Sequence, residues 1–305
     1  MNNPLIHIGY PKTASSWFQR NFFPFVQNVS HVTKSEINEK IIYPNSLDFD
    51  PEHTKEYFGN KYDKRLVISH ENLVGPVSCG GVNAYFTKEM AMRLNSLFPD
   101  SEIIIFIRNQ PDMISSAYIQ EVRAGGTYSI NNFLFHKVYK FFNNIFLFSF
   151  EYLEYHKVIK LYRKLFGENK VHVFLFEEFE KNNGNFIRDY IRKFDLKVDE
   201  TIIDYKKINV RYRKFLVHLV RFSNLFTKKN LVHKYYLFNI PFWYPFNRRI
   251  FEKLNRLRIF GKYVESKDIL GKKNFYYINN FYKNSNQRLV NDLKINSIKE
   301  YNYPL

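Results

Sequence analysis

The chain has 305 residues, 45% of them hydrophobic, which suits one large globular domain or two small ones and excludes a disordered protein. Its single cysteine, Cys79, excludes a disulfide framework and a thiolate metal site within one chain. The net charge of +17 indicates an anionic partner. We find no signal-like leader and no apolar run of the ~18 residues that a spanning helix needs, so we expect a cytoplasmic protein.

The first 200 residues alternate short apolar runs with segments of helical spacing. Strands are predicted at residues 5–9, 66–69, 102–107 and 171–176, and helices at 15–23, 83–98, from about 112, twice within 131–166, and at 183–194. This alternation predicts an α/β fold with a parallel sheet covered by helices on both faces. Side chains that follow the strands should therefore meet at one edge of the sheet, where ligands of such folds bind.

The pattern changes after residue 200. Residues 206–262 hold fifteen Lys or Arg and one acidic residue, Glu252. Apolar residues in this segment recur at helical spacing, at Phe215, Leu219, Phe222 and Phe226, and another amphipathic helix is predicted at 280–295. We predict a single domain over 1–305, with a core of 1–200 and 275–305. Residues 205–270 are a basic, aromatic helical elaboration in the C-terminal third.

A loop for binding an anion is predicted where the first strand ends. After Gly9 come Pro11, Lys12, Thr13, Ala14, Ser15, Ser16 and Trp17. The free N–H groups and the dipole of a helix N-terminus favour a phosphate or sulfate group, and Lys12 adds a mobile positive charge. A Walker A motif needs Gly-x-x-x-x-Gly-Lys-Ser/Thr, but here Pro11, not glycine, stands directly before Lys12. A kinase that cradles a triphosphate is therefore disfavoured.

A second element follows the strand at 102–107. Arg108 stands at the end of that strand, and Ser116 follows eight residues later. With the Lys12 loop, these residues resemble the sulfotransferases that use 3′-phosphoadenosine 5′-phosphosulfate (PAPS), in particular bacterial members that act on carbohydrates. The resemblance implies a P-loop-like sheet, PAPS as donor substrate and no metal. It also implies that residues 11–17 hold the 5′-phosphosulfate, and that Arg108 and Ser116 hold the 3′-phosphate.

Two departures from that family are visible. Ala14 replaces the usual glycine, and because a methyl group does not suit a positive φ, we expect Ala14 in the first turn of a helix. No Arg-Lys-Gly…Gly…Lys segment is present near the C-terminus, which argues against the small-molecule branch of the family. Arg211 and Arg213 follow the core where family members close over the donor, and both are expected to bind it.

Sulfuryl transfer is an in-line displacement that resembles phosphoryl transfer. Lys12 suits the bridging oxygen between sulfate and phosphate, and the acceptor hydroxyl needs a general base. The candidates are Glu71, our first choice, and His70, which both follow a strand. Because neighbouring side chains of an extended chain point in opposite directions, only one of the two should face the donor. His7 is expected to be a satisfied core histidine, and Glu177 a structural carboxylate.

These observations predict transfer of a sulfuryl group from PAPS to a hydroxyl of a carbohydrate, such as a glycan, glycolipid or capsular saccharide. A tyrosine or small phenolic or alcohol acceptor is the alternative. A basic module that binds membranes or nucleic acid without catalysis is the alternative from another class. The basic segment itself allows three interpretations: a solvated helical surface, a peripheral patch on the inner face of the membrane, or a cleft for an anionic glycan.

Overall fold

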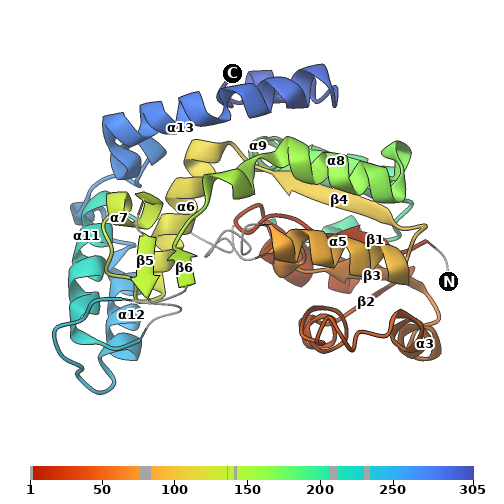
Figure 1. Cartoon of the computed structure of the whole chain (residues 1–305), viewed down its shortest axis with the longest axis horizontal. Coiled ribbons are helices and arrows are strands. Elements are labelled where there is room, and N and C mark those ends of the chain that lie inside the picture. Colours follow the sequence, from red (N-terminus) through yellow and green to blue (C-terminus); the bar gives the residue numbers. More distant parts are fainter. Residues whose placement is uncertain (1–2, 76–83, 136, 141–142, 206–211, 230–233) are drawn as a thin grey trace.

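A computed structural model describes residues 3–75, 84–135, 137–140, 143–205, 212–229 and 234–305, so Cys79 lies outside the described residues. Five parallel strands form a central sheet in the order β2-β3-β1-β4-β7 (Figure 1). Their bounds are β1 Leu5–His7, β2 Val29–His31, β3 Arg65–Ser69, β4 Glu102–Ile107 and β7 Val171–Leu175. The expected α/β fold with a parallel sheet is confirmed, and β4 has the bounds predicted for it.

Side chains of the strands alternate between two hydrophobic layers, as the two-residue period of a strand requires. Ile103, Ile105 and Ile107 of β4 pack on one face, with α5 (Tyr85–Leu97) and α8 (Tyr155–Phe166). Ile104 and Phe106 pack on the other face. That face is covered by α1 (Ser15–Trp17), the helical turns η1 (Phe18–Phe22) and η2 (Phe23–Phe25), α9 (Phe176–Lys181) and α10 (Asn183–Phe194).

The register of the sheet places the carboxyl ends of the strands at one edge. Leu5 pairs with Val67 of β3 on one side of β1 and with Glu102 of β4 on the other. The chain leaves β1 to build β2 and β3 on one side, and then β4 and β7 on the other. The end of β1 is therefore the point where the strand order reverses, which is the usual ligand site of an open α/β sheet.

Two features of the chain were not predicted. The segment expected to hold two helices contains α7 (Ile130–Phe135) and α8, but between them lies an antiparallel hairpin of β5 (Lys137–Lys140) and β6 (Asn143–Phe146). Edge strand β2 was not expected at all. Three or four residues are too few to show a two-residue period against a background rich in Phe and Asn.

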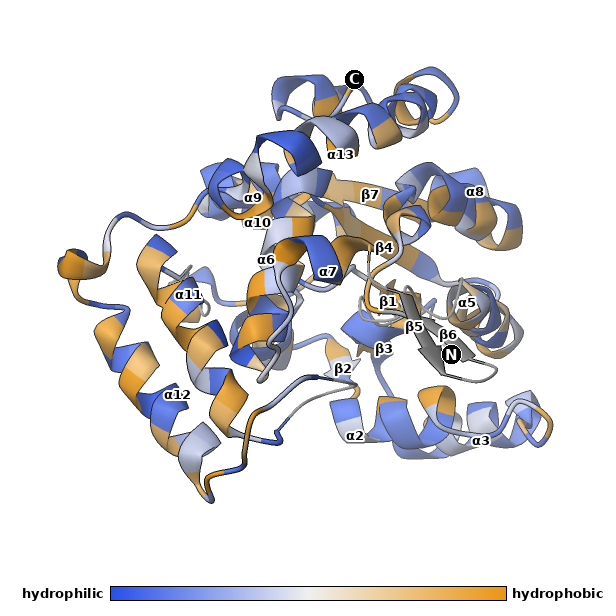
Figure 2. Ribbon diagram, turned by 60° about the vertical axis from the view of Figure 1, so that its left-hand side comes forward, coloured by the Kyte–Doolittle hydropathy of each residue, from blue (hydrophilic) through white to orange (hydrophobic). Residues whose placement is uncertain are grey.

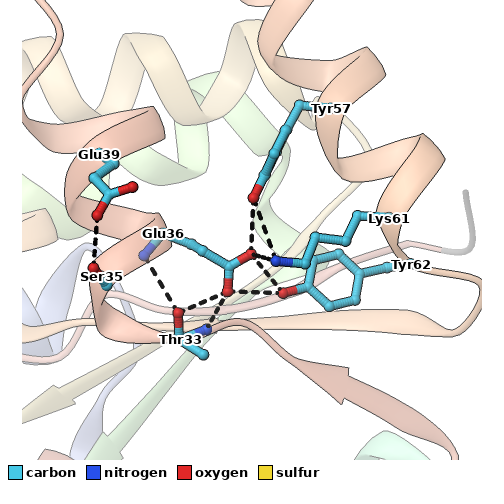
Figure 3. Close-up of polar contacts among 7 residues, drawn as sticks. All are labelled: Thr33, Ser35, Glu36, Glu39, Tyr57, Lys61 and Tyr62. Atoms are coloured by element: carbon cyan, nitrogen blue, oxygen red, sulfur yellow. Dashed lines mark hydrogen bonds and ion pairs between the residues drawn. The ribbon is translucent and has the colours of Figure 1, made fainter.

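Edge strand β2 leads into α2 (Lys34–Ile37), η3 (Asn38–Ile42) and α3 (Pro51–Lys61). Their junction is held by Glu36, whose carboxylate accepts hydrogen bonds from Lys61 Nζ at 2.6 Å and Tyr62 Oη at 2.8 Å (Figure 3). Burial raises the pKa of Glu36, but the hydrogen bonds from Lys61, Thr33 and Tyr62 outweigh it and lower the pKa to about 2. This cluster fixes α2, and with it the position of Lys34, beside the edge where the strands end.

The elaboration begins with α11 (Lys214–Ser223) and η8 (Asn224–Phe226), and continues through α12 (Trp243–Leu254) and η9 (Arg258–Phe260). Leu216, Val217 and Val220 of α11 are buried, and α11 packs against α6 (Gln110–Arg123) and α12. Figures 1 and 2 show α11 and α12 side by side at the end of the molecule away from α3.

The chain then returns to the core through α13 (Ser266–Asn291), which is kinked at Gly271, and η10 (Asn296–Glu300). The last residues bind the end of β4: Asn109 Nδ2 donates to the carbonyl of Tyr301 at 3.2 Å, and Tyr303 Oη donates to Glu177 at 3.1 Å. Glu177 also accepts the backbone N–H of Asn109 at 2.8 Å, in agreement with its expected structural role.

Candidate active site

The loop after β1 is tightly folded. Thr13 is fully buried and its hydroxyl donates to the carbonyl of Tyr10, and the carbonyl of Ala14 accepts the N–H groups of Trp17 at 2.8 Å and Phe18 at 3.1 Å. Lys12 and Ala14 have φ of 68° and 67°. The expectation of a helical Ala14 was therefore wrong, since Ala14 is the left-handed N-cap of α1, a conformation that glycine adopts without steric cost.

Aromatic side chains anchor the helical turns behind this loop. Trp17 Nε1 donates to the carbonyl of Asp204 at 2.8 Å, and the Trp17 ring packs against Phe18, Phe22 and Phe179. Ser15 is buried and Ser16 and Pro11 are half-buried. The loop is therefore fixed by packing on one side and lies beside the sheet edge on the other.

Arg108 lies against the loop, as expected for the second half of the site. Its Nη1 donates to the carbonyl of Lys12 at 3.1 Å, and its guanidinium lies over the ring of Phe176 at 4.6 Å. Tyr155 Oη fixes the same backbone by donating to the Arg108 carbonyl at 2.6 Å. Ser116 is half-buried on α6, the helix that starts just after Arg108.

Positive charge is concentrated around Lys12. Burial, together with the nearby charges of Arg123 and Arg108, lowers the pKa of Lys12 to about 8, while Glu71 acts against them. Arg123 is the last residue of α6. The positive charges of Arg108 and Arg123 thus both act at Lys12, which favours a ligand with several negative charges there.

Glu71 follows β3 on the other side of this region. Lys34 Nζ lies 2.8 Å from each of its carboxylate oxygens, and Gln19 Nε2 donates to one of them at 3.3 Å. Burial raises the pKa of Glu71, but the bonds and charge of Lys34 prevail and lower it to about 2. The side chain is therefore an ionised acceptor at neutral pH, close enough to Lys12 to act on its titration.

His70 serves a different purpose. It is buried, and its Nδ1 accepts the backbone N–H of Asn72 at 3.0 Å, which caps the short helical turn η4 (Glu71–Val74). Because Nδ1 is the acceptor, the neutral ring carries its proton on Nε2 and has no lone pair there for a second proton. Of the two candidate bases, the geometry favours Glu71.

A buried polar chain runs beneath the loop. His7 Nδ1 lies 3.0 Å from Ser69 Oγ, and Gln19 Nε2 donates to the Ser69 carbonyl at 3.0 Å as well as to Glu71. His7 Nε2 finds no hydrogen-bond partner in the described part of the chain, and a Cβ on Gly9 would lie 2.5 Å from it. His7 is thus only half satisfied, contrary to expectation, and it restricts position 9 to glycine. No local pattern in the sequence pointed to Gln19 or Lys34.

The two arginines of the elaboration are less informative. Arg211 lies outside the described residues. The guanidinium of Arg213 donates to the carbonyls of Asn255, at 3.0 Å, and Gly261, and lies over the ring of Tyr263 at 4.5 Å. These contacts join α11 to η9 and occupy the side chain. Over residues whose positions are described, no group of His, Cys, Asp and Glu is arranged to hold a metal ion.

Comparisons with known proteins give the fold a context. No family model matches the chain, and no curated protein matches it. Among solved structures, mouse sulfotransferase SULT7A1 complexed with PAP is similar over 99% of this chain and 88% of that one, with a TM-score of 0.50 and 12% identity. A sulfotransferase from Alicyclobacillus acidocaldarius has a TM-score of 0.49 and 20% identity, covering 68% of this chain and 87% of that one. The similarity to the mouse structure shows that the chain has the P-loop-like α/β fold of a sulfotransferase.

Proposed function

We propose that this protein transfers a sulfuryl group from PAPS to an acceptor hydroxyl. The observation that carries the proposal is the contact between Arg108 and the Lys12 loop at the carboxyl edge of the sheet. It brings together the two elements that a donor with phosphate groups at both ends needs. The similarity in fold to a sulfotransferase solved with PAP supports the same assignment.

The residues would divide the chemistry as follows. Lys12 and the N–H groups of residues 13–16 hold the phosphosulfate, while Arg108 and Ser116 hold the 3′-phosphate; the N–H of Trp17, which was also expected to contribute, is bonded to the Ala14 carbonyl. The sulfur–oxygen bond to the donor phosphate breaks as a bond from sulfur to the acceptor oxygen forms. The negative charge that develops on the leaving phosphate is stabilised by Lys12, and the acceptor's proton goes to Glu71. With a pKa of about 2, Glu71 mainly orients the hydroxyl and accepts its proton late in the transfer.

Donor binding gives the first test. We expect calorimetry to detect binding of adenosine 3′,5′-bisphosphate (PAP) and no comparable binding of ATP with Mg²⁺. Arg108→Ala should weaken PAP about 10- to 100-fold, because charge-assisted hydrogen bonds are lost. Arg192→Ala is the matched control, since Arg192 is an exposed arginine of α10 paired with Asp189. Binding of ATP–Mg²⁺ alone, or equal PAP affinity in the two variants, would contradict the proposal.

For the acceptor we propose a carbohydrate hydroxyl. The basic and aromatic elaboration adjoins α6 and its Arg123, so an acceptor with sugar rings and negative charge would meet aromatic faces and cations beside the donor. A panel of saccharides and glycolipids, compared with tyrosine peptides and simple phenols in an assay with labelled PAPS, tests this choice. Transfer only to phenols would establish the alternative acceptor class. PAP binding without transfer to any acceptor would favour a non-catalytic module.

A further inference from the structure

The outer surface of the elaboration carries large apolar side chains that the fold leaves in solvent. Of the twenty-two large hydrophobic residues that are exposed in the described chain, twelve lie between Phe215 and Tyr263. Those used in the argument are Phe215 at 62% exposure, Leu219 at 45%, Phe222 at 61%, Phe242 at 86%, Phe246 at 57% and Ile259 at 80%. We call this surface, formed by α11, α12 and η9, the α11–α12 face (Figure 2).

The apolar residues form a connected band. On α11, Phe215, Leu219 and Phe222 are spaced as one stripe of a helix, separate from the buried stripe that packs toward α6. The ring of Phe222 meets Phe226 at 5.6 Å between centroids, and Trp243 links Phe226 to Phe246 at 6.3 Å on each side. At the other end, a Cβ on Gly261 would lie 3.2 Å from the Phe215 ring, so η9 adjoins α11. A helix that was merely solvated would show polar residues here.

Phe242 is the most informative of these residues. It is the left-handed N-cap of α12, with φ 60°, a conformation that is rare for bulky residues. Its ring gains almost no packing in return, because it is the most exposed aromatic side chain in the described chain. Strained, exposed aromatics of this kind are expected where a partner, rather than the fold, supplies the contacts.

The charge of this face indicates the kind of partner. Exposed basic residues stand beside the apolar band, among them Arg249, Lys253, Arg256 and Arg258. Between Tyr205 and Glu265 the sequence has a single acidic residue, Glu252, and that side chain is paired with Arg248 at 3.1 Å and Arg123 at 3.5 Å. Aromatic and aliphatic side chains flanked by cations suit an anionic lipid surface, where the apolar groups enter the headgroup layer.

We propose that the α11–α12 face docks on an anionic phospholipid bilayer. Docking is peripheral, because no described helix is both long and apolar enough to span a bilayer. A nucleic acid would use the cations but has no counterpart for the aliphatic Leu219 and Ile259, and a saccharide would not need so broad an apolar band.

Docking would also place the candidate active site near the headgroups, an inference that rests on the proposed function. The charge of Arg123 lowers the pKa of Lys12, so Arg123 lies near the candidate site. Two residues of α12 bind Arg123: Glu252 pairs with its guanidinium, and Tyr244 Oη donates to its carbonyl at 3.1 Å. The acceptor that fits this arrangement is a saccharide carried on a lipid.

Co-sedimentation with vesicles tests the docking without any donor or acceptor. We expect the full chain to bind vesicles of phosphatidylcholine with 30% phosphatidylserine, to bind pure phosphatidylcholine much more weakly, and to dissociate in 0.5 M NaCl. Phe242→Ser with Phe246→Ser should lower partitioning ~10-fold or more, and Arg249→Ser with Lys253→Ser about 30-fold. Trp243 fluorescence should be quenched by brominated lipids, and Trp243→Phe should remove that quenching, because the chain's other tryptophan, Trp17, is buried in the core.

Matched controls come from elements that lie away from α11 and α12 (Figure 1). Tyr43→Ser with Leu47→Ser removes two exposed apolar side chains, and Lys160→Ser with Lys164→Ser removes two exposed charges of α8. Both should bind vesicles as the unchanged chain does, and thermal melts should show that all four double variants fold. Absence of vesicle binding at low salt, equal loss in controls and test variants, or retention by sulfated oligosaccharides or DNA but not by vesicles would overturn the proposal. PAP calorimetry is independent of these outcomes.

Discussion

The core and the elaboration use the same aromatic residues in opposite ways. In the core, Phe18, Phe22 and Phe106 are fully buried, and the ring of Phe18 contacts the other two behind the Lys12 loop. In the elaboration, Phe242 and Phe246 are more than half exposed. The difference shows that the Phe and Tyr residues of this chain occupy two kinds of environment: a buried cluster behind the Lys12 loop, and an exposed surface that we propose meets a bilayer.

The largest expected difference between the two regions is in stability. Phe18→Ala should lower the free energy of unfolding by about 3–5 kcal/mol, because it leaves a cavity among several aromatic rings. Phe246→Ala should change it by less than about 0.5 kcal/mol, since an exposed ring loses little packing. Chemical denaturation of both variants measures the contrast, and a similar loss in each would break the comparison.

Catalysis should separate the regions next. Lys12→Ala should lower kcat about 10²- to 10³-fold, by removing charge stabilisation of the leaving phosphate, while Lys253→Ala, in the elaboration, should leave transfer to a water-soluble acceptor unchanged. Because the pKa of Lys12 is lowered to about 8, PAP affinity should fall as the pH rises through that value. Calorimetry from pH 7 to 9 checks this, and Lys12→Arg should abolish the pH dependence, since arginine stays charged.

Acid stability offers a sharper test of the buried polar chain. Burial lowers the pKa of His7 to about 3, so between pH 6.5 and 3 the unfolded chain binds a proton that the folded chain does not. The free energy of unfolding should therefore fall as the pH drops below 6.5, by ~2–3 kcal/mol at pH 4.5. His7→Gln should flatten this slope and His218→Asn, at an exposed position of α11, should not. If the free energy of unfolding falls with pH equally in His7→Gln and the unchanged chain, groups other than His7 cause the acid sensitivity.

The smallest expected effect concerns two left-handed N-caps. Ala14→Gly should raise stability by up to about 1 kcal/mol, because glycine adopts a positive φ without steric cost. Phe242→Gly relieves the same strain in the elaboration, yet it should weaken vesicle binding. Thermal melts with and without PAP measure the first effect, and no gain in either condition would show that the loop tolerates the alanine methyl group freely.

Much of the core could be predicted from the sequence. Helix α10 begins and ends where it was expected, and the strands bring Lys12, Glu71 and Arg108 to one edge. Continuous β-branched runs and helical periodicity are local signals that can be read from the sequence. The parallel topology then brings the carboxyl ends of the strands to one edge, whatever the strand order.

The remainder depends on contacts between distant segments. The pairing of Glu71 with Lys34 follows from the place of β2 at the edge of the sheet, and β2 is too short to be recognised by its period. The φ of Ala14 is dictated by the way the loop turns beneath Arg108, against the preference of the residue itself. Side-chain burial in the elaboration likewise required the packing of α11 on α6.

The closing residues of the chain have a consequence for biosynthesis. Asn109, at the start of α6, is bonded to the carbonyls of Tyr301 and Asn302, and Asn286 Nδ2 donates to the carbonyl of Pro304 at 2.8 Å. Because Asn109 and Tyr301 lie 192 positions apart, the β4 end that carries Arg108 is fully braced only after residues 301–304 have been synthesised and have folded back onto it. A product truncated before residue 301 would lack these bonds beside the candidate active site.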